Sequence, residues 1–383
     1  MFSFEFATAN RIIFGAGKLN SLAEQLKDSV KRLLLVRGKS SDAIPRVRQI
    51  LSTQGIQFTE FEVHGEPSVE VVRAGVELAR GCDMLIGLGG GSVLDAGKAI
   101  AILATNPGDI FDYLEVIGKG QQFTRAPLPY IAVPTTAGTG TEVTRNAVIE
   151  SPAHEVKVSL RSPLMLPELA LVDPELTYSL PPAITASTGL DALTQLIEPF
   201  VSVKANPMTD AVCREGMRHA ARSLKRAYEN GGDVEARVRM LLASLFGGLA
   251  LANAGLGSVH GFAGQLGSML HAPHGAVCAR LLPLVMEANL NALKEREPGH
   301  PARARYAEIA QILTTHPDAT ASDGVAWVSE LVRDLEIPLL SAYGMSREHF
   351  PEAVEKTMKA SSTKGNPIRL TEAELMEVLE RAI

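Results

Sequence analysis

The stretch that decides the fold is MLIGLGGGSVLDAGKAIAIL, residues 84–103. Its apolar start, Met84 to Leu88, predicts a buried strand, and Val93 to Leu103 predicts a helix. The turn between them consists of Gly89, Gly90, Gly91 and Ser92. A glycine-rich turn at a helix N-terminus exposes backbone N–H groups, which suit a pyrophosphate. The stretch therefore predicts a nucleotide cofactor, although a glycine triplet after a strand is also common as a simple tight turn.

The spacing of this loop differs from two familiar phosphate-binding patterns. It does not follow G-x-G-x-x-G, and it is not a Walker A loop, because Lys98 is followed by Ala99 and lacks the required upstream glycine. The loop alone is therefore a weak signal that needs a second element.

That second element is PTTAGTGTE, Pro134 to Glu142, which directly follows the apolar run Tyr130 to Val133. Its small hydroxyls and accessible backbone suit a phosphate or the nicotinamide amide. The candidate side chains are Thr135, Thr136 and Thr139. The alternative is a threonine-rich turn that caps the next helix.

A third candidate loop follows the run that ends at Val36. An acidic residue at such a strand end binds the ribose 2′-hydroxyl of NAD, whereas a cation there accommodates the 2′-phosphate of NADP. No carboxylate precedes Asp42 here, and the loop offers Gly38, Lys39, Ser40 and Ser41. We therefore expect NADP rather than NAD, the alternative for this loop being solvated surface.

Outside these loops, the first half of the chain alternates short apolar runs with amphipathic stretches. The runs are Arg32 to Val36, Met84 to Leu88, Tyr130 to Val133 and Leu169 to Val172, and the amphipathic stretches include Ser41 to Gln54 and Val69 to Arg80. This alternation predicts a parallel sheet covered by helices. After Asp173, Pro181 and Pro182 open a tract that predicts helices to the end of the chain. We predict an α/β, Rossmann-like dinucleotide-binding domain over 1–180 and an all-α C-terminal domain over 181–383.

Composition and charge narrow the classes of function. The 383 residues carry a net charge of −6 with interspersed basic residues, which disfavours nucleic acid as a partner. The N-terminus has no signal-peptide pattern, so we expect a cytoplasmic protein. Cys82, Cys213 and Cys278 are widely spaced and are expected to be reduced, buried thiols. The charge-free tract from Met240 to Ala279 contains many glycines and polar residues, which favours a core helix over a membrane span.

This charge-free tract holds two histidines that predict a metal site. Asp191 lies on an otherwise apolar helix, where a buried carboxylate needs a cation. His260 and His274 are separated by 14 residues, about 21 Å along a continuous helix, so the helix must break if both bind one ion. Pro273 and Gly275 supply the break. Asp, His and His form a three-ligand set with an open position, typical of a catalytic site, and His271 is a candidate substrate or proton-relay group.

Taken together, these segments resemble the iron-containing (group III) alcohol dehydrogenase family, in the superfamily with glycerol dehydrogenase, maleylacetate reductase and dehydroquinate synthase. The matching segments are Arg11 to Gly17, the loop G-G-G-S-x-x-D-x-x-K from Gly89 to Lys98, Pro134 to Glu142, Val172 to Pro174, Gly189 to Leu193, His260-Gly261, Pro273 to Gly275 and Asn366-Pro367. The resemblance implies a dehydroquinate synthase-like architecture with a cleft between the two domains, and a homodimer. It also implies that Asp95, Thr135, Thr136 and Lys157 lie towards the coenzyme.

Two departures from the family pattern concern the metal. Iron-dependent members commonly carry a histidine ligand one turn after the aspartate, where this chain has Gln195, and a further active-site histidine where it has Gly264. A carboxamide is a poor transition-metal ligand. Glycerol dehydrogenase binds zinc with Asp and two His, so the resemblance leaves the metal open between Fe²⁺ and Zn²⁺, with Gln195 as a candidate fourth ligand.

The predicted function is an NAD(P)-dependent, metal-dependent oxidoreductase that interconverts a small alcohol and an aldehyde or ketone by hydride transfer. Three alternatives remain open: a maleylacetate-type reductase or glycerol-type polyol dehydrogenase, a dehydroquinate synthase-like lyase, and a metal-free homologue without catalysis. The lyase is disfavoured because no basic residue lies between Arg239 and Arg280 to hold a phosphate substrate.

Overall fold

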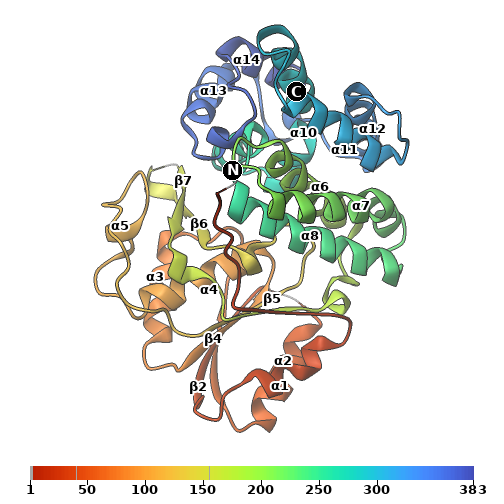
Figure 1. Cartoon of the computed structure of the whole chain (residues 1–383). Helices are drawn as coiled ribbons and strands as arrows, with labels where there is room; N and C mark the ends of the chain where they lie inside the picture. The colour runs from red at the N-terminus through yellow and green to blue at the C-terminus, as the bar shows by residue number, and fades with distance from the viewer. Residues whose placement is uncertain (1–2, 40, 155) are drawn as a thin grey trace. The chain divides into compact units, whose positions relative to one another are not determined.

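The structure, a computed structural model, describes residues 3–39, 41–154 and 156–383 (Figure 1). The contacts between residues divide the chain into two compact units. One comprises Thr8–Thr136 and Gly140–Ser179; the other comprises Leu180–Ile383, the N-terminal segment ending at Ala7, and Ala137–Thr139. The division into a dinucleotide-binding domain over 1–180 and a metal-binding domain over 181–383 stays a prediction. By their contacts, the segment ending at Ala7 and Ala137–Thr139 belong with the residues after 180.

The first unit is built on a parallel sheet of strand order β1-β8-β5-β4-β2-β3. The strands are β1 (Arg11–Phe14), β2 (Arg32–Arg37), β3 (Gln57–Glu62), β4 (Met84–Gly89), β5 (Tyr130–Pro134) and β8 (Leu169–Val172). The predicted parallel sheet is confirmed, and the four apolar runs become its four inner strands, β2, β4, β5 and β8.

Helices cover both faces of this sheet, as the alternation predicted. Side chains such as Leu34 and Leu85 point to one face and pack against α3 (Val69–Ala79) and α4 (Gly91–Leu103). The alternate residues of the same strands, such as Leu33 and Ile86, point to the other face and pack against η1 (Lys18–Ser21), α1 (Leu22–Gln25) and α2 (Ala43–Thr53). Strands that are buried on both faces read as continuous apolar runs.

The sequence patterns missed the two edge strands and one hairpin. β1 and β3 each pair with a single neighbour, and their side chains are largely exposed or half-buried. An edge strand lacks the continuous apolar run that betrays a buried one. The antiparallel pair β6 (Asn146–Ser151) and β7 (Val156–Arg161) was missed for the same reason, because its residues alternate between buried and half-buried. The remaining short elements of this unit are α5 (Ile110–Tyr113), η2 (Thr141–Val143), η3 (Pro152–His154), η4 (Pro163–Met165) and η5 (Pro174–Thr177).

The second unit is helical, which confirms the predicted fold class. Its elements are α6 (Pro182–Val201), α7 (Pro207–Glu229), α8 (Val234–Ala254), α9 (Ser258–Leu270), α10 (His274–Arg296), α11 (Ala302–Thr314), α12 (Ala321–Asp334), η6 (Leu340–Tyr343), η7 (Arg347–His349), α13 (Phe350–Lys359), η8 (Ser362–Gly365) and α14 (Glu372–Glu380). α6 packs against α7, α8 and α10, and α9 packs against α10 and α13.

The charge-free tract is divided among three of these helices. α8 and α9 meet at a bend of 102°, and α9 and α10 are separated by His271, Ala272 and Pro273. α10 is long and apolar enough to span a membrane, but 67% of its most apolar window is buried inside the protein. A helix that is apolar all round and covered by protein is typical of a core helix.

Candidate metal centre and coenzyme loops

Three helices of the second unit bring Asp191, His260 and His274 together. They project from α6, α9 and α10 respectively. His260 Nε2 lies 3.3 Å from Asp191 Oδ1, and His274 Nε2 lies 3.9 Å from the same oxygen. The side chains of Asp191 and His260 are 3% and 6% exposed, whereas that of His274 is 34% exposed. The residues predicted as metal ligands therefore form one cluster with one accessible member.

The break that this cluster requires lies where Pro273 predicted it. α9 ends at Leu270, His271 follows with a left-handed backbone (φ 50°), and Pro273 precedes the first turn of α10. His274 is the first residue of α10 rather than part of a turn. This break brings His274 beside His260, with ring centroids 5.4 Å apart.

The glycines that follow the two histidines allow this close packing. A Cβ added at Gly275 would lie 2.6 Å from the carbonyl oxygen of Ser187, on α6. A Cβ at Gly261 would lie 2.2 Å from Thr363 Oγ1. Only glycine permits such approaches, because real Cβ atoms do not come within 3 Å of other heavy atoms. Gly275 thus lets α10 approach α6, which carries Asp191.

Glu198 is a candidate positioning residue that the sequence patterns missed. It lies on α6 and is buried, its Oε1 accepts a hydrogen bond from the Val259 N–H at 2.7 Å, and its Oε2 accepts one from His260 Nδ1 at 2.6 Å. A carboxylate only accepts, so the proton of the neutral imidazole lies on Nδ1 and the Nε2 lone pair faces Asp191. Its signal in the sequence was a second acidic residue two turns after Asp191 on the same apolar helix.

Gln195 and Cys278 complete the surroundings of the cluster. Gln195 is buried one turn after Asp191, and its Nε2 donates a hydrogen bond to Asp191 Oδ2 at 3.0 Å. Cys278 is buried one turn after His274, with its Sγ 3.6 Å from His274 Nε2. One donor atom each from Asp191, His260, His274 and Cys278 lie within 4.8 Å of one another. The expectation of a buried Cys278 is thus correct, but its place in a polar cluster was not foreseen.

The electrostatics of the cluster favour a cation. Burial raises the pKa of Asp191, but the nearby rings of His260 and His274 outweigh it and lower the pKa overall. Burial lowers the pKa of His274, but its interactions with Cys278 and Asp191 raise it to about 9. The lowered pKa keeps Asp191 ionised, and a buried carboxylate that is ionised attracts a cation.

The donor set fits a divalent metal ion. Within the part of the chain that the structure describes, Asp191 Oδ1 and His260 Nε2 are buried without a hydrogen-bond partner. Buried polar atoms are normally paired, so two unpaired atoms that face each other indicate a missing partner. Carboxylate and imidazole are ligands of both zinc and iron.

The first unit brings the two predicted coenzyme loops side by side. β4 and β5 are neighbours in the sheet, with Gly89 opposite Pro134, and the Thr135 N–H donates to the Gly89 carbonyl at 3.0 Å. A Cβ at Gly90 would lie 3.3 Å from Thr136 Cγ2. Gly38 lies at the end of the adjacent strand β2 and donates to the Leu88 carbonyl. These loops meet at the carboxyl edge of a parallel sheet, where ligands bind in doubly wound folds.

Asp95 and Lys98 of the glycine-loop motif hold the second loop in place. Lys98 is fully buried, and its ammonium contacts Asp95 at 3.0 Å and Thr141 Oγ1 at 2.6 Å. Asp95 also accepts from the Thr141 hydroxyl and from the Val148 N–H. Asp95 therefore has a visible structural role, and its predicted contact with the coenzyme stays a prediction.

The other predicted residues are spread over several positions. Lys157, on β7, has a 7% exposed side chain and pairs with Glu66 at 3.5 Å. Ser41 accepts a hydrogen bond from the Ala43 N–H at the start of α2, and Lys39 is exposed, whereas Ser40 lies outside the described residues. Thr139 belongs to the second unit. His271 is exposed at the end of α9 and is not a member of the four-residue cluster.

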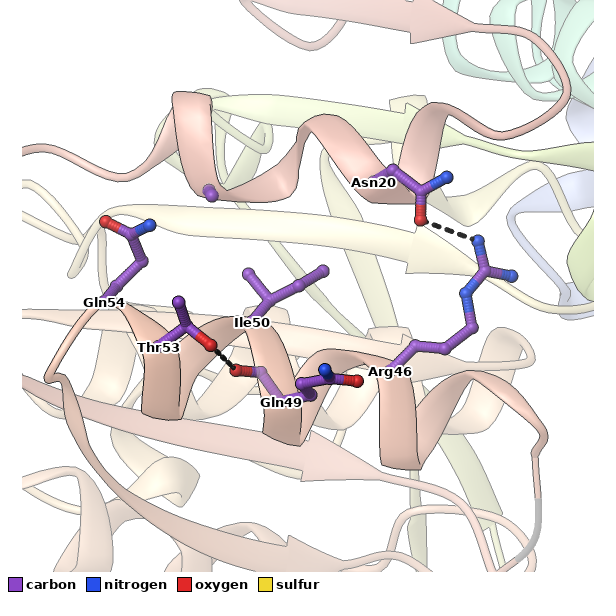
Figure 2. Close-up of a pocket in the computed structure, with 7 residues that line it drawn as sticks. Asn20, Arg46, Gln49, Ile50, Thr53 and Gln54 are labelled. Atoms are coloured by element: carbon purple, nitrogen blue, oxygen red, sulfur yellow. Dashed lines mark hydrogen bonds between the residues drawn. The ribbon is translucent and has the colours of Figure 1, made fainter.

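A surface pocket on the first unit has a different lining from these sites. It lies between the η1–α1 segment and α2, and its lining includes Asn20, Arg46, Gln49, Ile50, Thr53 and Gln54 (Figure 2). Arg46 donates to Asn20 across it at 3.1 Å. None of the predicted site residues lines this pocket.

Comparisons with known proteins agree with the geometry. The family model described as iron-containing alcohol dehydrogenase matches residues 9–174, and the C-terminal model of the Fe-containing alcohol dehydrogenase family matches residues 185–383. Alcohol dehydrogenase 4 of Schizosaccharomyces pombe is 38% identical over 379 residues, covering 97% of this chain and 87% of that protein.

Solved structures show the same likeness along the whole chain. A 1,3-propanediol oxidoreductase is 34% identical with a TM-score of 0.91, and the match covers 100% of each chain. Sulfoacetaldehyde reductase from Bifidobacterium kashiwanohense, solved in complex with NAD⁺, is 27% identical with a TM-score of 0.87 and covers 100% of this chain and 99% of its own. The chain therefore belongs to the iron-containing alcohol dehydrogenase family and is an oxidoreductase of that family.

Proposed function

We propose that the protein transfers a hydride between NAD(P) and a small alcohol or its aldehyde or ketone, at a metal ion held by Asp191, His260 and His274. One observation supports this most directly: these three side chains converge from three helices, and two of their buried donor atoms lack partners among the described residues. We further propose that residues 1–180 bind the dinucleotide and that residues 181–383 hold the metal.

The bound divalent ion would act as a Lewis acid that polarises the substrate oxygen during hydride transfer. The chain's own residues prepare this site. Glu198 keeps the proton of His260 on Nδ1, so that Nε2 is free to bind, and the Gln195 amide keeps Asp191 Oδ2 engaged, so that Oδ1 faces the histidines. The exposure of His274 marks the side from which substrate enters.

All but one of the proposed coenzyme residues belong to the first unit, the exception being Thr139. Gly89, Gly90, Gly91 and Ser92 at the start of α4 would hold the pyrophosphate through backbone N–H groups, and Thr135, Thr136, Thr139 and Lys157 would lie towards the nicotinamide half. We retain NADP as the favoured coenzyme, because Lys39 is exposed at the end of β2 beside Gly38 and Ser41. Arg37, the last residue of β2, is not proposed to bind the 2′-phosphate, because its guanidinium already donates to Glu60 and Glu62.

The proton that accompanies hydride transfer needs a path to solvent. His271 is proposed as the relay, with a water chain or a ribose hydroxyl as the alternative. Gly264 leaves open space where a side chain would stand, since an added Cβ would meet no heavy atom within 4 Å. A His271→Ala variant with an unchanged pH profile of kcat would exclude the histidine from this role.

The relatives support a small substrate. Their names include alcohol dehydrogenase, 1,3-propanediol dehydrogenase and choline dehydrogenase. We propose a short alcohol or aldehyde as substrate, with a polyol or maleylacetate as the alternative within the same class. A cytoplasmic location and a homodimer complete the proposal.

The decisive experiment joins a substrate panel to metal analysis. Purified protein is assayed with NADPH and NADH on short aldehydes, diols and maleylacetate, and its iron and zinc contents are measured. We expect turnover with one aldehyde class, a preference for NADPH, and loss of both metal and turnover in Asp191→Ala. Full turnover and full metal content in Asp191→Ala would contradict the assignment of the site.

A further inference from the structure

Cys278 is the one member of the cluster that neither the sequence patterns nor the proposed mechanism uses. It lies one helical turn after His274 on α10, so both side chains emerge on the same face of that helix. Its side chain is fully buried, and its Sγ is within 4.8 Å of the donor atoms of Asp191, His260 and His274. A cysteine that only fills a core would be surrounded by apolar side chains.

A second observation, independent of the cysteine, indicates that a cation binds here. Asp191 Oδ1 and His260 Nε2 are aimed at the same space, both side chains are more than nine-tenths buried, and neither atom has a hydrogen-bond partner within the described ranges. The Cys278 sulfur borders this space from α10, on the side of His274.

Two of the separations between donor atoms equal the edges of a tetrahedron around one metal ion, and all of them lie within 4.8 Å. With metal–nitrogen and metal–oxygen bonds of about 2.0–2.1 Å and a metal–sulfur bond of about 2.3 Å, such edges measure about 3.3 Å for nitrogen and oxygen and about 3.6 Å for nitrogen and sulfur. His260 Nε2 and Asp191 Oδ1 are 3.3 Å apart, and His274 Nε2 and Cys278 Sγ are 3.6 Å apart. His274 to Asp191 is the looser edge at 3.9 Å, and the exposed side of His274 leaves it room to turn.

We propose that Cys278 is a fourth protein ligand of the metal ion, bound through its thiolate sulfur, and that Gln195 is not a ligand but positions Asp191. The inference rests on the proposed function, because it concerns the same ion. The Gln195 amide nitrogen is engaged with Asp191 Oδ2. Its Oε1 is also buried without a hydrogen-bond partner among the described residues, but it lies towards α8, 3.3 Å from where a Cβ at Gly247 would stand, and carboxamides bind transition metals weakly. Metal binding forms the metal–sulfur bond and releases the thiol proton to solvent.

A thiolate ligand changes which metal the site selects. Two anionic ligands, Asp191 and Cys278, balance the charge of a divalent ion in a buried site. Sulfur favours zinc and other softer ions over magnesium or calcium. Zinc with four protein ligands can accept a fifth, so the position for substrate is retained. The ligand set thus favours zinc or another softer divalent ion over magnesium and calcium.

X-ray absorption of the zinc-loaded wild-type protein tests the proposal without any substitution. We expect one sulfur scatterer at about 2.3 Å beside nitrogen and oxygen scatterers at about 2.0 Å. A shell that contains only nitrogen and oxygen would overturn the role of Cys278 and leave the metal site intact. A wild-type protein that binds no zinc, iron or cobalt would overturn the proposed function together with this inference.

Cobalt substitution provides the matched comparison between variants. Cobalt-loaded wild-type protein is expected to show sulfur-to-cobalt charge-transfer absorption in the near ultraviolet, together with visible ligand-field bands. Cys278→Ser should lose the charge-transfer absorption and keep the ligand-field bands. Its zinc affinity should fall at least about 100-fold, since even residues that only orient a metal ligand change the affinity about 10–100-fold. Cys82→Ser, which removes a half-buried thiol on the other unit, should behave as wild type. Charge-transfer absorption that persists in Cys278→Ser would refute the proposal.

Discussion

Glu198 shows how much one buried side chain can determine. Its two carboxylate oxygens reach two consecutive residues, the N–H of Val259 at the start of α9 and the ring of His260. The first contact satisfies an N–H group that a helix start leaves unpaired, and the second orients a candidate ligand. The carboxylate therefore couples the position of α9 to the tautomer of His260.

Glu198→Gln tests this coupling with little change in shape. The new amide can still accept from Val259 through its oxygen, but its NH₂ group would face His260 Nδ1. The imidazole would then carry its proton on Nε2 and lose the lone pair that faces Asp191. We expect zinc affinity, measured by competition with a chromophoric chelator, to fall about 10–100-fold. Glu287→Gln, which alters an exposed ion pair with Arg381, should leave affinity unchanged; equal affinities in the two variants would refute the coupling.

Glu142 predicts a pH dependence of stability in the first unit. It is buried, and burial raises its pKa from 4.5 to about 7, against the opposing charge of Lys98. Between these two values the folded protein holds a proton that the unfolded chain has released. The free energy of unfolding therefore falls as pH rises through this window, by at most about 1.4 kcal/mol per pH unit for this group, and is level above it.

Glu142→Gln should remove this part of the pH dependence. Urea unfolding of the variant and of wild type, at pH values that span the window, should give a difference in free energy that grows in favour of the variant as pH rises. Glu77→Gln, at an exposed position on α3, serves as the control. A constant difference across the window would show that Glu142 is ionised in the folded protein.

At the scale of elements, the junction of α9 and α10 decides whether the cluster can form. Two helices that continued as one would separate His260 from His274, and the break at His271–Pro273 prevents this. α10 then needs close contact with α6, which Gly275 permits. Gly275 contacts α6 closely, whereas an added Cβ at Gly264 would contact nothing, so substitutions at these two glycines can be compared directly.

Gly275→Ala is expected to disturb the cluster. Its Cβ would press on the Ser187 carbonyl of α6, backbone that cannot rotate away, so α10 and His274 would be displaced. We expect a lower thermal midpoint and loss of most bound metal. Normal metal content in this variant would contradict the proposed packing role.

Gly264→Ala is expected to have the opposite effect on stability. Gly264 lies within α9, and an added Cβ would meet no heavy atom within 4 Å. Alanine in a helix interior is favoured over glycine by about 0.5–1 kcal/mol. Chemical denaturation should therefore show a rise of that size with metal content unchanged, and a loss of stability would indicate an unrecognised contact.

For the whole molecule, metal binding should stabilise the second unit selectively, because all four donors of the cluster belong to it. Zinc at 100 times its dissociation constant should raise the free energy of unfolding of that unit by about 2.7 kcal/mol. Calorimetry with zinc and with a chelator should show the shift in wild type and not in Asp191→Ala. An equal shift in both proteins would mean that zinc binds elsewhere.

Much of the architecture could be predicted from the sequence pattern alone. The inner strands of the sheet were predicted because burial on both faces leaves an unbroken apolar run, as from Met84 to Leu88. The edge strand β3 was not, because Glu60 and Glu62 stand where an apolar run would otherwise lie and pair with Arg37 of the neighbouring strand β2. These charged residues are close together in the folded sheet but far apart in the sequence, so no local sequence pattern shows that they pair.

The fold class, the glycine loop after β4 and three candidate donors could be predicted from the sequence, because they follow from local periodicity, turn chemistry and the scarcity of charge around Asp191, His260 and His274. Only the tertiary structure decided what surrounds those donors. Cys278 and Glu198 read as ordinary helix residues until three helices converge, since proximity between α6, α9 and α10 depends on long-range packing that no local pattern records.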